Sequence, residues 1–322
     1  MLGNIRPYFK KIWLAGFNGG CSPDVLCIRS NGKVSAEFLY SLLSQDVFFD
    51  YDMAGAKGSK MPRGDKNHIM NFPVPNISSK EEIGKFIVSI DNKIQNNNKI
   101  NTELEAMAKI IYDYWFLQFE FPNEEGKPYK SSGCKMVWND ELGQEIPEGW
   151  YTVKVYEILS KVNNSNKLSS SEYKARGKYP IVDQSAKIIC GYTDDDNGKI
   201  DFKNCIIFGD HTKIVKYIDF DFVRGADGTQ VINSNNNSLP NYILYNQIKN
   251  MSLVSQGYSR YFKFLKDKYV LIPSKTIADK YMKIIEKPLN MIKKNTFENL
   301  KLTNIRDYLL PLLMNGQVGF KN

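Results

Sequence analysis

The sequence contains the same long helix pattern twice. Between residues 78 and 118, apolar residues recur at alternating steps of four and three, which is the spacing of a coiled-coil seam rather than of a strand. These positions are Ile83, Ile87, Ile90, Ile94, Leu104, Ala108, Ile111 and Trp115. A shift of 198 residues, without a gap, gives the second set: Tyr281, Ile285, Pro288, Ile292, Leu302, Arg306, Leu309 and Leu313. A long amphipathic helix needs a partner for its apolar face, so we predict that the two copies pair.

A polar break in the middle of each seam is repeated as well. The central positions of the first copy are Asn97 and Asn101, and the same shift leads to Asn295 and Asn299. A buried Asn weakens a helix pair but fixes its register. We predict that these four residues pair the helices, with Asn97 against Asn299 and Asn101 against Asn295, as antiparallel packing requires.

Each copy also has the sequence of a helix start. The pairs Ser78 with Glu81 and Thr276 with Asp279 match an N-terminal capping pattern. A strand-like run that ends in proline precedes each pair, at residues 72–75 and 270–273. Two unrelated amphipathic helices would not be expected to share these flanking features.

Composition limits the remaining possibilities. The 322 residues are 42% hydrophobic, which suits more than one domain with a packed core. A net charge of +8 favours a polyanionic partner, but only weakly. No run of 18 apolar residues and no apolar segment of a signal peptide occurs, so we expect a cytoplasmic protein. Five cysteines without a C-x-x-C pair and two histidines predict free thiols, with no metal and no cofactor.

The motifs of common catalytic sites are missing. The sequence has no phosphate-binding loop, no dinucleotide fingerprint, no zinc-protease motif and no amino-methyltransferase motif. Residues 194–198 resemble a calcium loop but lack its terminal glutamate, and Glu172 with Lys174 lacks the rest of a nuclease motif. Asp210 and His211 form a candidate acid and base pair, but a structural histidine is the better interpretation.

Residues 1–77 are predicted to form a first module. Strand-like runs at 11–14 and 25–28 are followed by a helix from Ala36 to Ser44 and by a glycine-containing basic loop at 55–64. Glycines allow a backbone to approach another molecule closely, and cations suit phosphates or base edges. The candidate DNA-binding residues of this loop are Lys57, Ser59, Lys60 and Arg63. A merely solvated loop fits these residues equally well.

A second module is predicted from Ile146 to residue 275, after a linker at 119–145 in which residues 136–138 could form a short strand. Its short apolar runs and turns indicate a mixed, mostly β module with a helix near 242–248. Its candidate DNA-binding residues are Lys174, Arg176, Lys178, Lys213, Gln256, Tyr258, Arg260 and Lys263. The last four lie in a basic, glycine-bearing segment that corresponds, in the helix repeat, to the loop of the first module.

Several motifs together resemble the specificity subunits of type I restriction-modification enzymes. They are I-P-E-G-W at 146–150, G-D-H-T at 209–212, G-A-D-G-T at 225–229, K-M-P-R at 60–63, Y-W-F at 114–116, I-P at 272–273 and the run at 309–318. The resemblance covers nearly the whole chain. It implies an α+β fold in which two mixed, mostly β target recognition domains are separated by two long repeated helices, packed as an antiparallel coiled coil. The corresponding segments are 1–77, 78–118, 119–145, 146–275 and 276–322.

The same resemblance implies a function. Each recognition domain would read half of a split double-stranded DNA site, methyltransferase subunits would dock on the helices, and a restriction subunit would join through them. The specificity subunit itself would be non-catalytic. A helical scaffold that reads no DNA stays open as the alternative, and a free-standing nuclease or methyltransferase is disfavoured by the missing motifs.

The first module departs from the family pattern. It lacks the I-P-x-G-W opening and about 60 residues that precede the matching point in the second module. We therefore expect the apolar residues Trp13, Leu14, Val25 and Leu26 to need a cover, supplied by a second specificity polypeptide or by self-association.

Overall fold

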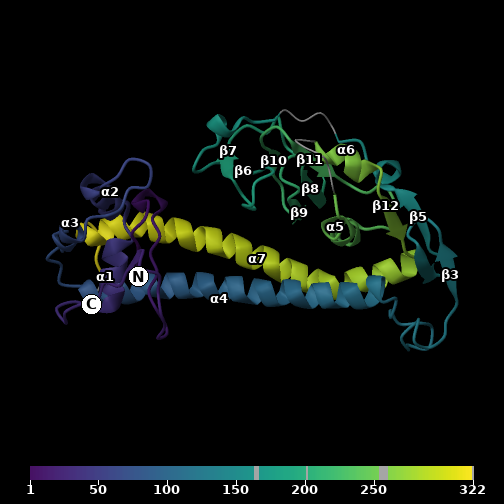
Figure 1. The fold of residues 1–322 in the computed structure, drawn as a ribbon, viewed down its shortest axis with the longest axis horizontal. Helices are drawn as coiled ribbons and strands as arrows, with labels where there is room; N and C mark the ends of the chain where they lie inside the picture. The colour runs from purple at the N-terminus through teal and green to yellow at the C-terminus, as the bar shows by residue number, and fades with distance from the viewer. Residues whose placement is uncertain (163–166, 201, 254–259, 321–322) are drawn as a thin grey trace. The chain divides into compact units, whose positions relative to one another are not determined.

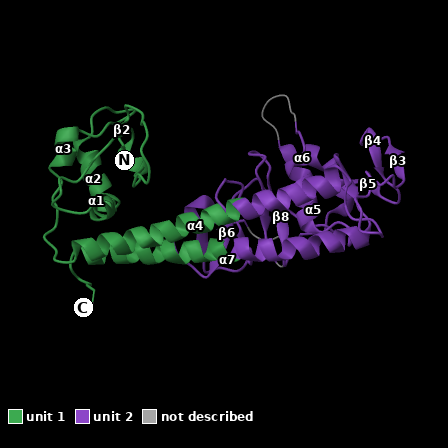
Figure 2. Ribbon diagram, turned by 90° about the horizontal axis from the view of Figure 1, so that it is seen from below, with its two compact units in different colours: residues 1–102, 294–322 green, residues 103–293 purple. Residues whose placement is uncertain are grey.

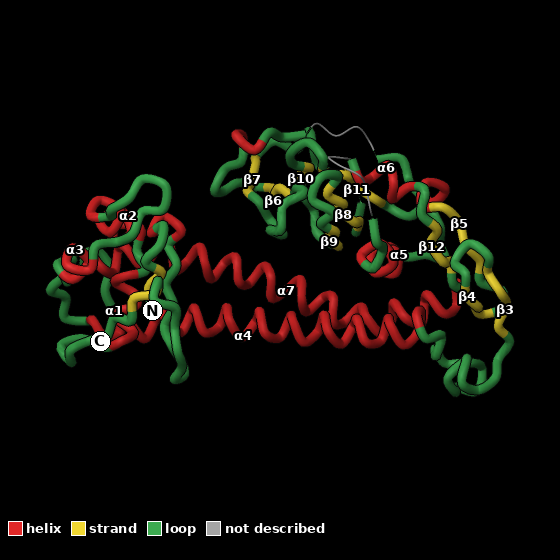
Figure 3. The backbone as a smooth tube through the Cα atoms, viewed as in Figure 1, coloured by secondary structure: helices red, strands yellow, loops and turns green. Residues whose placement is uncertain are grey.

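The structure is a computed structural model that describes residues 1–162, 167–200, 202–253 and 260–320. The chain divides into two compact units, coloured separately in Figure 2. Unit 1 contains residues 1–102 and 294–322, and unit 2 contains residues 103–293. Both units combine helices with small sheets, as Figure 3 shows, so the predicted α+β class is confirmed.

The two predicted long helices are present (Figure 1). Helix α4 runs from Lys80 to Tyr112 and continues as the π-helix η2, Asp113–Leu117, while α7 runs from Lys275 to Met314. In unit 1 their seam residues Ile83, Ile87 and Leu313 are buried against one another's helix. The seam spacing therefore predicted both the helices and their buried face.

The predicted capping residues are wrong by one or two positions. Ser79 precedes α4 and its carbonyl accepts from the N–H of Ile83 at 3.0 Å, and Ser274 precedes α7 and accepts from Ile277 at 3.1 Å. Thr276 lies inside α7. Each helix start has neighbouring hydroxyl residues, so the capping pattern could not fix which one comes first.

Unit 1 is built from short elements. Strand β1 (Leu2–Gly3) pairs antiparallel with β2 (Val25–Leu26), and the 3-10 helix η1 spans Pro7–Phe9. The predicted helix is present as α1 (Ala36–Leu43). The predicted strand at 11–14 is reduced to a single bridge between Leu2 and Ile12, and residues 72–75 form no strand. Prolines 73 and 75 remove two donors, which prevents a ladder there.

Two further helices of unit 1 were not predicted. They are α2 (Asp46–Gly55) and α3 (Lys66–Met70). Phe48 and Phe49 of α2 pack with Leu2 and Ile69 in a small core. Aromatic and aspartate residues are weak helix formers, so burial of the two rings stabilises α2 more than propensity does.

Unit 2 contains short sheets. Strand β5 (Tyr151–Lys154) pairs antiparallel with β12 (Tyr269–Ile272). Strand β6 (Tyr179–Val182) lies between β7 (Gly191–Thr193), to which it is antiparallel, and β10 (Val223–Arg224), to which it is parallel.

The most buried sheet of unit 2 is centred on β8 (Cys205–Gly209), whose five residues are all buried. It pairs antiparallel with β9 (Val215–Ile218) and with β11 (Thr229–Ile232). The unit also contains the helices α5 (Asn241–Lys249) and α6 (Tyr261–Lys266) and the 3-10 helices η3 (Val155–Ile158) and η4 (Ser170–Glu172). The predicted helix near 242–248 is therefore confirmed as α5.

The segment 119–145 is folded and is not a free linker. Its end forms a hairpin of β3 (Met136–Asn139) and β4 (Gln144–Pro147). Phe119 and Phe121 are buried against Trp150, and the rings of Phe121 and Trp150 stack with centroids 5.0 Å apart. The segment was predicted as a linker because it is rich in Pro, Gly and Ser, and this composition does not reveal that Phe119 and Phe121 are buried.

Candidate nucleic-acid interface

The four asparagines of the helix seam lie together in unit 1. The Nδ2 of Asn97 donates to Oδ1 of Asn299 at 2.9 Å, and the Nδ2 of Asn295 donates to Oδ1 of Asn101 at the same distance. Asn97 also donates to Glu298 at 2.7 Å. Asn97 is only 1% exposed, so these bonds satisfy an amide that would otherwise be buried without partners.

A second polar contact joins three helices of unit 1. Nη1 of Arg306 lies 2.6 Å from Oδ1 of Asp91, and the hydroxyl of Tyr40 donates to Oδ2 of Asp91 at 2.8 Å. Burial, together with the neighbouring Asp91 carboxylate, raises the pKa of Tyr40. The buried contact therefore ties α1 to the helix pair.

The basic loop of unit 1 is closed at its base by backbone hydrogen bonds. The backbone groups of Lys57 and Arg63 exchange two hydrogen bonds of 2.9 Å, and Gly58 adopts a φ of 100°. Ser59 and Lys60 are exposed at the tip. A Cβ at Gly64 would clash with the carboxylate of Asp52, so the close approach of the loop requires glycine.

Both cations at the base of this loop are paired with acids. Nζ of Lys57 lies 2.6 Å from Asp65, and Nη1 of Arg63 lies 3.0 Å from Asp24. Asp65 also caps α3, accepting from the N–H groups of Asn67 and His68. The hydrogen bond from Lys57 and the cap lower the pKa of Asp65 to about 2.

The cations at 174–178 of unit 2 are exposed. Lys174 forms an ion pair of 2.8 Å with Asp194, and its backbone exchanges two hydrogen bonds with Tyr192. Nζ of Lys178 lies over the ring of Tyr179, 4.9 Å from its centroid, and Arg176 is exposed between the two lysines. The three side chains therefore project from one short loop.

Lys213 is held differently from the other candidates. It has a φ of 59°, its Nζ donates to the carbonyl of Leu253 at 2.9 Å and it lies 4.1 Å from the ring centroid of Tyr261. These contacts direct the ammonium group toward the protein. Arg260 and Lys263 are exposed at the start of α6, whereas Gln256 and Tyr258 lie outside the described residues.

The structure adds a polar cluster that the sequence did not predict as a site. Gln184 accepts from the N–H of His211 at 3.2 Å and donates to the carbonyl of Asp227 at 2.8 Å. It thereby joins the G-D-H-T and G-A-D-G-T motifs, which are separate in sequence. A lone glutamine after a strand carries no recognisable pattern, so sequence alone could not find it.

Asp210 positions the helix that carries Lys263. Its carbonyl accepts from the N–H of Tyr261 at 2.9 Å and its Oδ1 accepts from the N–H of Phe262 at 2.8 Å. The carboxylate therefore caps α6, from a site distant in the sequence. This contact assigns Asp210 a structural role, consistent with the earlier interpretation of the Asp210 and His211 pair.

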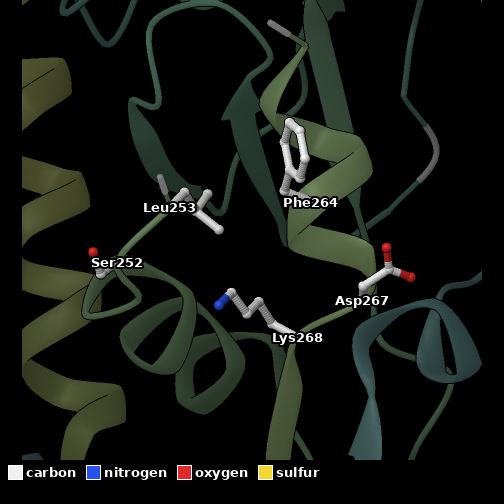
Figure 4. Close-up of a pocket in the computed structure, with 5 residues that line it drawn as sticks. All are labelled: Ser252, Leu253, Phe264, Asp267 and Lys268. Atoms are coloured by element: carbon white, nitrogen blue, oxygen red, sulfur yellow. The ribbon is translucent and has the colours of Figure 1, made fainter. Parts of the chain in front are cut away.

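A shallow cavity of about 280 Å³ lies beside α6 (Figure 4). It is lined by Ser252, Leu253, Phe264, Asp267 and Lys268. Phe264, Asp267 and Lys268 are exposed, as expected for a surface depression rather than for an enclosed small-molecule site.

The described part of the chain shows neither a metal centre nor a membrane-spanning helix. No three His, Cys, Asp or Glu side chains gather as metal ligands there. Among the same residues, no helix combines the length and the apolar character needed to cross a membrane.

Comparison with known proteins gives relatives of one kind, although no protein-family model matches the chain. The specificity subunit of the type I restriction enzyme MjaIX from Methanocaldococcus jannaschii is 28% identical over 319 residues, covering 90% of this chain and 71% of the relative. The HindI specificity subunit from Haemophilus influenzae is 22% identical over 381 residues, covering 92% of this chain and 81% of the relative.

A solved structure supports the fold. The S subunit of a type I restriction-modification system from M. genitalium superimposes with a TM-score of 0.50 at 17% identity, covering 86% of this chain and 72% of that one. The resemblance inferred from the motifs is thus confirmed: the chain is a relative of the specificity subunits of type I restriction-modification enzymes, and it has their fold.

Proposed function

We propose that this chain is the non-catalytic subunit that gives a type I restriction-modification complex its DNA sequence specificity. The observation that carries the proposal is the presence, in both units, of exposed cations on glycine-containing loops that the fold anchors at their bases. Relatives along most of the chain are specificity subunits, which supports the same role. In this proposal residues 1–77 and 146–275 are the recognition domains.

The DNA-facing cations are Lys57, Lys60 and Arg63 in unit 1 and Lys174, Arg176, Lys178, Arg260 and Lys263 in unit 2, with Ser59 beside them. Three of them already form ion pairs at the surface, Lys57 with Asp65, Arg63 with Asp24 and Lys174 with Asp194. Such pairs stabilise a folded protein by at most about 1 kcal/mol, so a DNA phosphate can replace the carboxylate. Gln256, Tyr258 and Lys213 remain candidates from the sequence, although Lys213 would first have to leave Leu253.

The helices are proposed to bind methyltransferase subunits through apolar side chains that face solvent. In unit 2, α4 and η2 expose Met107, Ile110, Tyr114 and Leu117, which are spaced by three and four residues on one face. In unit 1, α7 exposes Ile305 and Tyr308. Exposed apolar stripes of this kind mark protein-binding surfaces.

The repeat relates the two stripes. A shift of 198 residues carries Met107 to Ile305 and Ile110 to Tyr308, and all four are exposed, whereas Ala108 and Leu310 beside them are buried. Equivalent surfaces on the two copies favour two equivalent docking sites, one for each of two methyltransferase subunits.

Co-purification with the methyltransferase subunit tests the docking surfaces, and DNA titration tests recognition. Ile110→Asp and Tyr308→Asp should each weaken methyltransferase capture while leaving the melting temperature unchanged, because both side chains are exposed. Lys60→Ala should weaken DNA binding but not capture. A protein that captures methyltransferase yet shows no DNA affinity in any assembly would be a scaffold, and the proposal would be wrong.

A further inference from the structure

The first residues of unit 1 expose an unusual amount of aromatic surface. Tyr8, Phe9, Trp13 and Phe17 are 47%, 54%, 40% and 73% exposed. The rings form two pairs, with centroids 4.8 Å apart for Tyr8 and Phe9 and 5.3 Å apart for Trp13 and Phe17. Large rings grouped in solvent usually mark a binding surface.

Cations lie among these rings. The guanidinium of Arg6 is 6.0 Å from the ring centroid of Phe9, and Nζ of Lys11 is 5.7 Å from the same centroid. Lys11 is exposed, and the face therefore combines a π surface with positive charge. That combination complements a nucleobase and the phosphate beside it.

The aromatic turn is held against the basic loop. The N–H of Arg6 donates to the carbonyl of Pro62 at 2.7 Å, and the N–H of Gly64 donates to the carbonyl of Asn4 at 3.2 Å. Nζ of Lys10 lies 2.6 Å from Asp46, which fixes the far side of the turn. Residues 4–6 therefore bond to the end of the loop Lys57–Arg63, and the rings of Tyr8 and Phe9 in η1 come immediately after them in the chain.

The backbone of the turn is also constrained. Arg6 and Lys10, which flank η1, both adopt a φ of 52°, a conformation that long side chains rarely take. Such residues persist where the surrounding contacts hold them, and they are frequent at binding sites. These contacts and backbone conformations hold Tyr8 and Phe9 in a defined position.

We propose that this turn is an aromatic wedge that contacts unstacked bases of DNA, with Phe9 as the stacking ring. Arg6, Lys11 and the neighbouring basic loop would hold the phosphates on either side. The inference rests on the proposed DNA-binding function and adds to it a site that distorts DNA or selects already distorted DNA.

The charge of the surface favours DNA over a protein occupant. Centres of protein interfaces are depleted of lysine, whereas this aromatic face has Lys11 against Phe9 and Lys10 beside it. Insertion of apolar side chains between base steps, flanked by cations, is by contrast a common way of binding deformed duplexes.

Competition between two duplexes tests the wedge in the full-length chain. One is a perfect 30-base-pair duplex, and the other is identical except for one unpaired adenine. Stacking of one base on an aromatic ring contributes about 1–3 kcal/mol, so the wild type should prefer the bulged duplex by about 5- to 150-fold. Phe9→Ala should remove the preference and leave affinity for the perfect duplex within about twofold.

The control is Phe264→Ala, which removes another exposed phenylalanine, from unit 2, and should keep the preference. Equal binding of both duplexes by the wild type, or an unchanged preference in Phe9→Ala, would overturn the wedge while leaving DNA binding intact. Loss of self-association in Phe9→Ala, with DNA binding unaltered, would also overturn it and identify a protein-docking face. A wild type that binds neither duplex, alone or assembled with its methyltransferase subunit, would contradict the proposed function itself.

Discussion

Asn97 and Asn299, 202 residues apart in the sequence, meet through a 2.9 Å hydrogen bond from Nδ2 to Oδ1. They lie in the two copies of the repeat, and each is three residues from an apolar seam position, Ile94 in the first copy and Leu302 in the second. A buried amide pair disfavours any sliding of one helix along the other, because sliding would bury unpaired polar groups. The pair therefore specifies register at the expense of some stability.

Replacing Asn97, Asn101, Asn295 and Asn299 together by leucine should stabilise the helices and weaken their register. We expect the melting temperature to rise by about 2–4 °C for each kcal/mol gained, with new oligomers visible by sedimentation. The exposed Asn96→Leu is the control and should change neither quantity. Unchanged melting and a single species in the fourfold variant would show that the asparagines do not set the register.

Loss of the contact between Arg306 and Asp91 should lower the free energy of unfolding more than loss of an exposed ion pair of unit 1. Arg306→Met leaves the 8%-exposed Asp91 without its cation, and we expect a loss of about 2–4 kcal/mol in the free energy of unfolding. Removing the exposed pair of Lys93 and Glu298 through Lys93→Met should cost less than about 1 kcal/mol. Denaturant titration measures the free energy of unfolding of both variants. Equal losses would show that the buried contact of Arg306 stabilises unit 1 no more than the exposed pair does.

Two carboxyl groups of unit 1 should respond to pH in opposite directions. The folded-state pKa of Asp65 lies near 2, below its value in the unfolded chain, so its contribution to stability is complete above about pH 4 and disappears as the pH falls toward 2. Asp65→Asn should therefore destabilise the protein at pH 7 and differ little from the wild type near pH 2.

Asp52 is fully buried, and neither of its oxygens has a hydrogen-bond partner among the described residues. Burial raises its pKa, so the folded state holds its proton more tightly than the unfolded state does. The charged Asp52 carboxylate therefore destabilises the folded state at pH values above its folded-state pKa. This loss of stability disappears below the pKa that Asp52 has in the unfolded chain. Asp52→Asn should raise the free energy of unfolding at pH 7 by about 1–2 kcal/mol, with no gain at pH 3. Thermal unfolding between pH 2 and 8 measures both variants, and a destabilised Asp52→Asn at pH 7 would refute the assignment.

Arg260 and Lys263 should make different contributions to DNA binding. If Arg260 contacts a base, Arg260→Ala weakens binding by about 1–3 kcal/mol and reduces discrimination at one position. Lys263→Ala, as a phosphate contact, should reduce the slope of log K against log salt by about one and affect all sequences alike. Lys283→Ala on α7 is the charge-matched control. Titrations at several salt concentrations that show neither change would remove the start of α6 from the interface.

The sequence predicted those parts of the fold that repeat with a fixed period. The seam of Ile83, Ile87 and Leu313 and the strand around Ile206 follow from apolar spacing alone. Features that depend on contacts between distant residues were missed. Helix α2 exists because Phe48 and Phe49 have a core to enter, and the segment 119–145 folds because Phe121 stacks on Trp150.

The candidate site shows the same division. Exposed cations such as Lys60 and Arg176 could be identified from their glycine-bearing loops, since charge and composition are local properties. The hydrogen bonds of Gln184 to His211 and Asp227 could not be identified in this way, and neither could the cap that Asp210 gives to α6. Each depends on a partner that only the fold brings close.

Selection of DNA from a random duplex library tests the central claim most directly. The chain, assembled with its methyltransferase subunit, is incubated with the library, and the bound fraction is sequenced. We predict enrichment of a defined sequence, with Arg260→Ala relaxing the preference at one position of it. An assembled complex that binds DNA without enriching any sequence would contradict the assignment of sequence specificity to this chain.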